Sequence, residues 1–135
     1  MVKKLKTILL VDDDKATNFI NKRVIKKTGC ADEVLLTYNG IEALELLTTP
    51  VNGTYIKPDL ILLDVNMPKM NGWEFMEEYA KLSDEQKGKI VIIMLTTSLN
   101  PSDREKAEEI KEITAFEKKP LSEEVLLAIL AKYFE

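Results

Sequence analysis

The sequence predicts an α/β fold in which a five-stranded parallel sheet is doubly wound, with helices on both of its faces. Five apolar runs of strand length are continuous rather than alternating, as expected for strands that are buried on both sides. The runs cover residues 8–11, 34–36, 60–63, 90–95 and 113–116. A segment with helical spacing of apolar residues follows each run, so the expected order is a strand and then a helix, five times.

The five helices are predicted from apolar residues that recur every three or four positions. In chain order these residues are Ala16, Phe19, Ile20 and Val24; Ile41, Leu44 and Leu47; Trp73, Met76, Tyr79 and Ala80; Ala107 and Ile110; and Leu126, Ile129, Leu130 and Tyr133. Residues typical of helix ends flank the same segments. They are Gly29 after the first helix, Asn39 and Gly40 before the second, Gly72 at the start of the third, Ser102 with Glu105 at capping-box spacing for the fourth, and Ser122 for the fifth.

The composition excludes several kinds of chemistry. The chain has no histidine, so it cannot carry a Ser-His triad, a His-bound zinc ion or a phosphohistidine of its own. Its one cysteine, Cys30, rules out an internal disulfide and a cysteine cluster for zinc. A formal net charge of -4 without a basic run argues against nucleic-acid binding. Carboxylate chemistry remains as the main candidate.

The length of 135 residues is enough for one hydrophobic core, so we expect a single domain over residues 1–135 with no separate output domain. No segment approaches the ~20 apolar residues that cross a bilayer. The N-terminal segment ends in aspartates rather than in small residues, which is not typical of a secretory signal. We therefore expect a cytoplasmic protein without membrane association.

Polar side chains follow the carboxyl ends of several predicted strands. Asp12 and Asp13 end the first run, Asp64 ends the third, Thr96 ends the fourth, and Lys119 follows the fifth. In a doubly wound sheet, ligands bind outside the carboxyl ends of the strands, so these side chains are expected at one edge. Clustered carboxylates repel one another unless a cation offsets them, and an oxygen-rich site suits Mg²⁺. The lysine and the threonine hydroxyl would suit phosphoryl oxygens.

An aspartate is the predicted acceptor of the phosphoryl group. The sequence contains neither GxxxxGK[ST] nor GxGxxG, so the glycine-rich loop of a nucleotide-binding protein is missing. A carboxylate can itself act as the nucleophile and form an acyl phosphate. Asp64 is the best candidate because it stands alone at the end of the strongly apolar run 60–63.

Taken together, these motifs resemble the receiver domain of two-component response regulators, in particular the single-domain, chemotaxis-regulator-like type. The resemblance rests on Asp12-Asp13, on residues 64–72 with the sequence DVNMPKMNG, on Thr96 and on Lys119-Pro120, in this order and spacing. It covers nearly the whole chain, from about residue 5 to about residue 134. It implies a flavodoxin-like (βα)5 fold with the strand order 2-1-3-4-5.

The resemblance also implies roles for the acidic residues. Asp64 would be the phosphoacceptor. Mg²⁺ would be held by Asp12, Asp13, Asp64 and the backbone carbonyl of Asn66. A shift by one residue would make the acidic pair Asp13 and Asp14, but the resemblance and the end of the apolar run favour Asp12 and Asp13.

Further roles are implied for residues at the ends of the fourth and fifth strands. Thr96 and Lys119 would contact the phosphoryl oxygens, and the Lys119-Pro120 peptide bond would be cis. Thr96 and Phe116 would form a switch in which the aromatic ring follows the movement of the threonine. Thr97 is bulkier than the residue often found at its position, which leaves the lifetime of the phosphoryl group open.

As a functional expectation, the resemblance implies a stand-alone receiver that is a signalling domain rather than an enzyme. A separate histidine kinase or histidine phosphotransfer protein would donate the phosphoryl group, and intrinsic Mg²⁺-dependent self-phosphorylation and autodephosphorylation are expected. The response would be a change of surface over residues 100–112 and 115–134, which would bind a downstream protein target. The chain is expected to be a monomer or a weak dimer.

Three other functions remain as alternatives. A phosphatase of the haloacid dehalogenase type would use Asp12 as the nucleophile, paired with Asp14, but it would leave residues 64–72 unexplained. A receiver-like interaction module that never takes phosphate is expected to lack one of the acids or the lysine, and none is missing. A flavodoxin-like cofactor carrier would need a phosphate-binding loop after the first strand.

Overall fold

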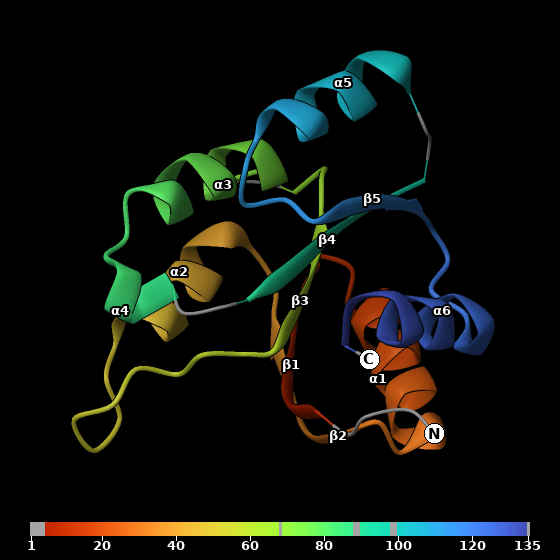
Figure 1. Ribbon diagram of the computed structural model, residues 1–135, viewed down its shortest axis with the longest axis horizontal. Coiled ribbons are helices and arrows are strands. Elements are labelled where there is room, and N and C mark those ends of the chain that lie inside the picture. The colour runs from red at the N-terminus through yellow and green to blue at the C-terminus, as the bar shows by residue number, and fades with distance from the viewer. Residues whose placement is uncertain (1–4, 68, 88–89, 98–99, 135) are drawn as a thin grey trace.

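The computed structural model describes residues 5–67, 69–87, 90–97 and 100–134. The predicted doubly wound sheet is confirmed: five parallel strands run in the order β2-β1-β3-β4-β5 (Figure 1). The strands are β1 (Leu5–Val11), β2 (Ala31–Thr37), β3 (Leu60–Asp64), β4 (Val91–Thr96) and β5 (Ala115–Lys118). Because β1 lies between β2 and β3, the carboxyl ends of β1 and β3 are neighbours.

Helices cover both faces of this sheet. The five predicted helices are α1 (Lys15–Thr28), α2 (Gly40–Thr48), α3 (Gly72–Ala80), α5 (Pro101–Glu109) and α6 (Glu123–Phe134). A one-turn helix that was not predicted, α4 (Asp84–Lys87), precedes β4. Four residues are too few to show a helical period, which is why the sequence pattern did not reveal it. Figure 1 shows α1 and α6 on one face of the sheet and α2, α3 and α5 on the other.

Successive residues of the strands alternate between two hydrophobic cores. In β1, Leu9 and Val11 belong to the core under α2, α3 and α5, whereas Ile8 and Leu10 belong to the core under α1 and α6. Every residue of β3 is buried. Burial on both faces is the physical reason that the strands read as continuous apolar runs rather than as alternating ones.

Two of the apolar residues that predicted α1 face solvent. Phe19 and Ile20 are 60% and 54% exposed, and the inward face is formed by Asn18, Asn21 and Ile25. These three residues also recur at helical spacing, and the predicted helix is confirmed. An apolar pattern counts only apolar side chains, so two buried asparagines do not contribute to it.

The ends of most helices lie where the sequence placed them. Gly29 ends α1 in the left-handed conformation, with φ of 67°, and the Asn39 side chain caps α2. The hydroxyl of Ser122 accepts a hydrogen bond from the Val125 backbone N–H in the first turn of α6. The predicted capping box of Ser102 and Glu105 is wrong, because Asn100 is the N-cap of α5 and accepts from the Ser102 backbone N–H.

The fifth strand lies two residues beyond its predicted position. The apolar run 113–116 predicted its start at Ile113, but β5 covers Ala115–Lys118. Ile113 packs against the core from the segment that precedes the strand. The shift brings the carboxyl end of β5, and Lys119 after it, level with Thr96 at the end of β4.

Candidate functional site

Three carboxylates meet at the carboxyl edge of the sheet. Asp12 directly follows β1 and Asp64 ends β3; these strands pair side by side, with Val11 opposite Leu63. Asp12 and Asp64 are only 4% and 7% exposed, whereas Asp13 is exposed. One oxygen from each of these three aspartates lies within 4.8 Å of those of the other two. The topology thus gathers acids that are 52 positions apart in sequence.

Lys119 is the cation that faces this cluster. Its Nζ lies 2.7 Å from Asp12 Oδ2 and 2.9 Å from Asp64 Oδ1, so the ammonium group bridges both buried carboxylates. The Lys119 backbone N–H donates to the carbonyl oxygen of Thr96 at 2.6 Å, which ties the lysine to the end of β4. The peptide bond between Lys119 and Pro120 is cis. Within the described part of the chain, the ammonium group of Lys119 therefore faces three carboxylates.

The electrostatics of the site reflect burial and this imbalance of charge. Burial raises the pKa of Asp64 to about 6; the hydrogen bond from Lys119 opposes the rise, and the charges of Asp12 and Asp13 add to it. Burial alone would lower the pKa of Lys119, but its bonds to Asp12 and Asp64 outweigh burial and hold that pKa above its usual range. The lysine is therefore charged near neutral pH, while Asp64 titrates unusually high for an aspartate.

Asp14 has a different position from the other aspartates. It is the N-cap of α1: its Oδ1 accepts from the backbone N–H of Ala16 at 2.9 Å, and its Oδ2 accepts from the Thr17 hydroxyl at 3.0 Å. Hydrogen bonds from Thr17 and Ala16 lower the pKa of Asp14. The geometry thus groups Asp12 and Asp13 with Asp64 and uses Asp14 to begin the helix.

The remaining predicted site residues lie around this cluster. Thr96 is buried at the end of β4, one residue beyond Leu95, which pairs with Asp64 across the sheet. Asn66 follows β3 and is exposed, and Pro68 of the DVNMPKMNG motif lies outside the described residues. Phe116 is buried in β5, and its ring stacks on that of Trp73 in α3 with 6.4 Å between centroids.

Gly72 connects the site to α3 by a close backbone approach. Its N–H donates to the Val65 carbonyl oxygen at 2.8 Å, and a Cβ added here would lie 2.7 Å from the Asp64 carbonyl oxygen and 3.0 Å from Val65 Cα. We expect Gly72→Ala to destabilise the domain by about 1–3 kcal/mol, because backbone must move to admit the methyl group.

Urea denaturation checks this expectation, with Gly40→Ala as the matched control. The three atoms nearest to a Cβ at Gly40 all belong to the flexible side chain of Met70, with its Cγ and Sδ at 2.8 Å. The control should therefore lose less stability than Gly72→Ala. Equal losses would contradict the explanation.

Asn18, which lies on the buried face of α1, was not predicted as a site residue. Its side-chain amide donates to the backbone carbonyl oxygens of Asp12 and Thr37, at 2.9 and 3.1 Å. These two residues lie at the carboxyl ends of the adjacent strands β1 and β2. The signal in the sequence was an asparagine six positions after Asp12, and asparagines in helices are too common for that spacing to single it out.

The donor set fits a divalent cation that prefers oxygen ligands. The three aspartates offer carboxylate oxygens, the chain has no histidine, and hard cations such as Mg²⁺ and Mn²⁺ favour oxygen ligands. Two of the three acids are buried, and among the described residues Lys119 alone is recorded in ion pairs with them, so a further positive charge at this edge would be electrostatically favourable.

Comparison with known proteins identifies the family. The model of the response regulator receiver domain matches residues 8–131. Response regulator Rcp1 of Synechocystis is 36% identical over 101 residues, which are 73% of this chain and 66% of Rcp1, so the chain spans just under two thirds of that relative. A sensor histidine kinase of Helicobacter pylori, CheAY, is 32% identical over 125 residues, 93% of this chain but 14% of that protein.

Solved structures agree with this result. A two-component response regulator from Cytophaga hutchinsonii has a TM-score of 0.82 and 31% identity, with 96% of this chain and 97% of that one covered. An Mn²⁺-bound form of Rcp1 has a TM-score of 0.71 and 29% identity, with 94% and 90% covered. The chain belongs to the response regulator receiver domain family of two-component systems.

Membership in this family fixes the general class of function. Receiver domains are signalling domains, not enzymes in the ordinary sense, and they interact with histidine kinases or phosphotransfer proteins. Phosphorylation on aspartate is their general mechanism, and they bind a divalent metal. Within the described ranges, no helix combines the length and the apolar character that a transmembrane segment needs.

Proposed function

We propose that this domain accepts a phosphoryl group on Asp64 from the phosphohistidine of a partner histidine kinase or phosphotransfer protein, with Mg²⁺ as the metal. The observation that carries the proposal is the Lys119 ammonium group between the buried carboxylates of Asp12 and Asp64. This geometry supports the proposal because the three carboxylates and the ammonium group lie within a few ångströms of one another, as a nucleophile, metal ligands and a fixed cation would need to.

The transfer follows from these charges. A carboxylate oxygen of Asp64 attacks the phosphorus in line with the leaving imidazole; the P–N bond breaks, and the imidazole keeps the electron pair and takes up a proton. Mg²⁺ held by Asp12, Asp13, Asp64 and the Asn66 carbonyl would neutralise charge on the phosphoryl oxygens. Lys119 would exchange its bonds to the carboxylates for bonds to the same oxygens.

Small phosphodonors test the chemistry without a partner. Purified protein incubated with phosphoramidate and Mg²⁺ should form an acyl phosphate, and borohydride reduction followed by peptide mapping should locate it at Asp64. The label should also decay without added phosphatase, as intrinsic dephosphorylation requires. A label at Asp12 would favour the haloacid dehalogenase type of phosphatase, and no label would favour a phosphate-independent interaction module.

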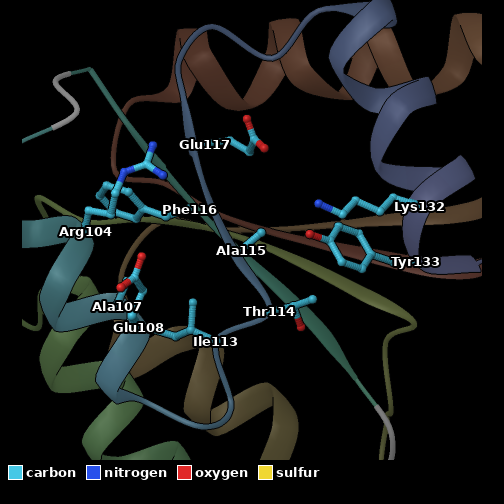
Figure 2. Close-up of a pocket in the computed structure, with 10 residues that line it drawn as sticks. All are labelled: Arg104, Ala107, Glu108, Ile113, Thr114, Ala115, Phe116, Glu117, Lys132 and Tyr133. Carbon is cyan, nitrogen blue, oxygen red and sulfur yellow. The ribbon is translucent and has the colours of Figure 1, made fainter.

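The proposed output surface lies on α5, β5 and α6, where the downstream protein target would bind. Among the described residues of α5, Ala107 alone is buried, so few contacts hold this helix on the sheet. A cavity of about 260 Å³ lies between these elements. Figure 2 shows Arg104 and Glu108 of α5 on one side of it and Lys132 and Tyr133 of α6 on the other.

In the proposed switch, Thr96 moves toward the phosphoryl group and Phe116 responds. Phe116 lines the cavity between α5 and α6 and also stacks on Trp73, so a change in its ring position would alter both the cavity and the packing of α3. Lys106 of α5 lies over the same Trp73 ring, 4.9 Å from its centroid. Because Trp73 is the one tryptophan, its fluorescence would report the switch.

The affinity for Mg²⁺ should fall as the pH is lowered, and the pKa of Asp64 should set the pH at which this fall begins. Since burial raises the pKa of Asp64 to about 6, protons compete with Mg²⁺ for this carboxylate as the pH falls below that value. The dissociation constant is expected to rise by about tenfold per pH unit well below pH 6. Calorimetric titrations between pH 5 and pH 8 measure it, and Asp64→Asn should show a flatter dependence.

A further inference from the structure

Asn18 is a fully buried polar residue that joins α1 to the carboxyl ends of β1 and β2. Its Nδ2 donates to the carbonyl oxygens of Asp12 and Thr37, and the Asp12 N–H donates to the same Thr37 carbonyl at 3.2 Å. The amide therefore closes a small network at the point where the chain leaves β1. In Figure 1, α1 follows β1 and lies on one face of the sheet.

The side-chain oxygen of Asn18 has no hydrogen-bond partner among the described residues. A buried oxygen without a partner destabilises a fold, and an apolar side chain at this position would avoid that cost. Ile25, two turns later on the same face of α1, is such a residue. The cost of the unpaired oxygen comes with the two hydrogen bonds that the amide N–H groups donate. The role of Asn18 is therefore to be sought in the two carbonyl oxygens that accept these bonds, those of Asp12 and Thr37.

The amide holds the peptide plane between Asp12 and Asp13. Its acceptor, the Asp12 carbonyl, belongs to this planar unit, so the bond fixes the direction in which the chain continues to Asp13. The next residue is fixed as well, because the Asp14 N–H donates to Asp12 Oδ1 at 2.9 Å. The orientations of the Asp12 and Asp13 carboxylates relative to Asp64 thus depend on a short, hydrogen-bonded turn that Asn18 anchors.

We propose that Asn18 is a positioning residue of the metal site: through the Asp12 carbonyl it holds Asp12 and Asp13 in the arrangement that binds the divalent ion. The inference rests on the proposed function, because it takes these aspartates as metal ligands. Groups that orient metal ligands typically contribute 10–100-fold to metal affinity. Asn18 would do so through the backbone, without touching the ion.

The test compares Asn18→Leu, which has a similar shape but no donor, with Asn21→Leu. Asn21 is also buried on the inner face of α1, one turn later, and no hydrogen bond among the described residues joins it to Asp12. Mg²⁺ alone is titrated into each folded full-length chain by calorimetry. Asn18→Leu should bind Mg²⁺ at least ~10-fold more weakly, whereas Asn21→Leu should match the wild type.

Two further measurements separate positioning from general stability. Amide hydrogen exchange at Asp13 and Asp14 should become faster in Asn18→Leu and stay unchanged in Asn21→Leu. Asn18→Ser, whose short hydroxyl cannot replace both bonds, should also bind Mg²⁺ more weakly, and it decides the question if Asn18→Leu does not fold.

Three outcomes overturn the inference, and one of them also overturns the proposed function. Unchanged Mg²⁺ affinity in the Asn18 variants, or equal weakening in Asn21→Leu, would overturn the positioning role alone. A wild-type chain that does not bind Mg²⁺ would overturn both.

Discussion

Asp64→Asn is expected to abolish the acyl phosphate while leaving the domain folded. An amide is a poor nucleophile toward phosphorus, and in the proposed site Asp12 and Asp13 hold Mg²⁺ and do not attack the phosphorus. Phosphoramidate labelling followed by intact mass spectrometry measures the effect. Asp14→Asn is the matched control, because asparagine caps a helix as well as aspartate does, and it should be labelled like the wild type.

The same substitution should not cost stability at neutral pH. The pKa of Asp64 lies above its unfolded value of 3.8, at about 6, so this group stabilises the fold most below pH 3.8 and loses that contribution as the pH rises through 6. In the absence of metal, a neutral asparagine removes the penalty of a buried charge. Urea denaturation at pH 7 should show equal or greater stability, and full labelling of Asp64→Asn would reject the assignment.

Much of the sheet could be predicted because burial on both faces leaves a plain signal. The run 60–63 became the fully buried β3, and Asp64 ended it as expected. This signal is weaker in β5 at the edge of the sheet, because Phe116 is its one buried residue. The predicted start of this strand was therefore two positions too early. In α1 the apolar spacing predicted the helix, but Phe19 and Ile20 face solvent and two asparagines lie on the buried face.

The sequence predicted which residues form the site and at which strand ends they lie, but it did not predict the contacts between their side chains. Asp12, Asp64 and Lys119 could be placed at one edge by topology alone, since parallel strands end together. That Lys119 bridges Asp12 and Asp64, rather than facing solvent beside Lys118, depends on the side-chain geometry at the end of β4. The role proposed for Asn18 likewise depends on how α1 packs on the sheet, and the spacing of residues in the sequence does not reveal this packing.

Lys119→Met should destabilise the metal-free domain by about 3 kcal/mol, because it leaves two buried carboxylates without their cation. Methionine has a similar length, so packing changes little. Urea denaturation in a chelating buffer measures the loss. Lys118→Met is the control: this exposed neighbour in β5 should change stability only slightly.

Added Mg²⁺ should reverse most of this loss. A divalent ion at the acidic cluster supplies the positive charge that the lysine provided, and a ligand that binds only the folded state stabilises it in proportion to its affinity. Lys119→Met should therefore bind Mg²⁺ more tightly than the wild type and yet take up phosphate more slowly, since the fixed cation for the phosphoryl oxygens is gone. A loss of stability that millimolar Mg²⁺ does not reverse would show that the lysine supports the fold by packing rather than by charge.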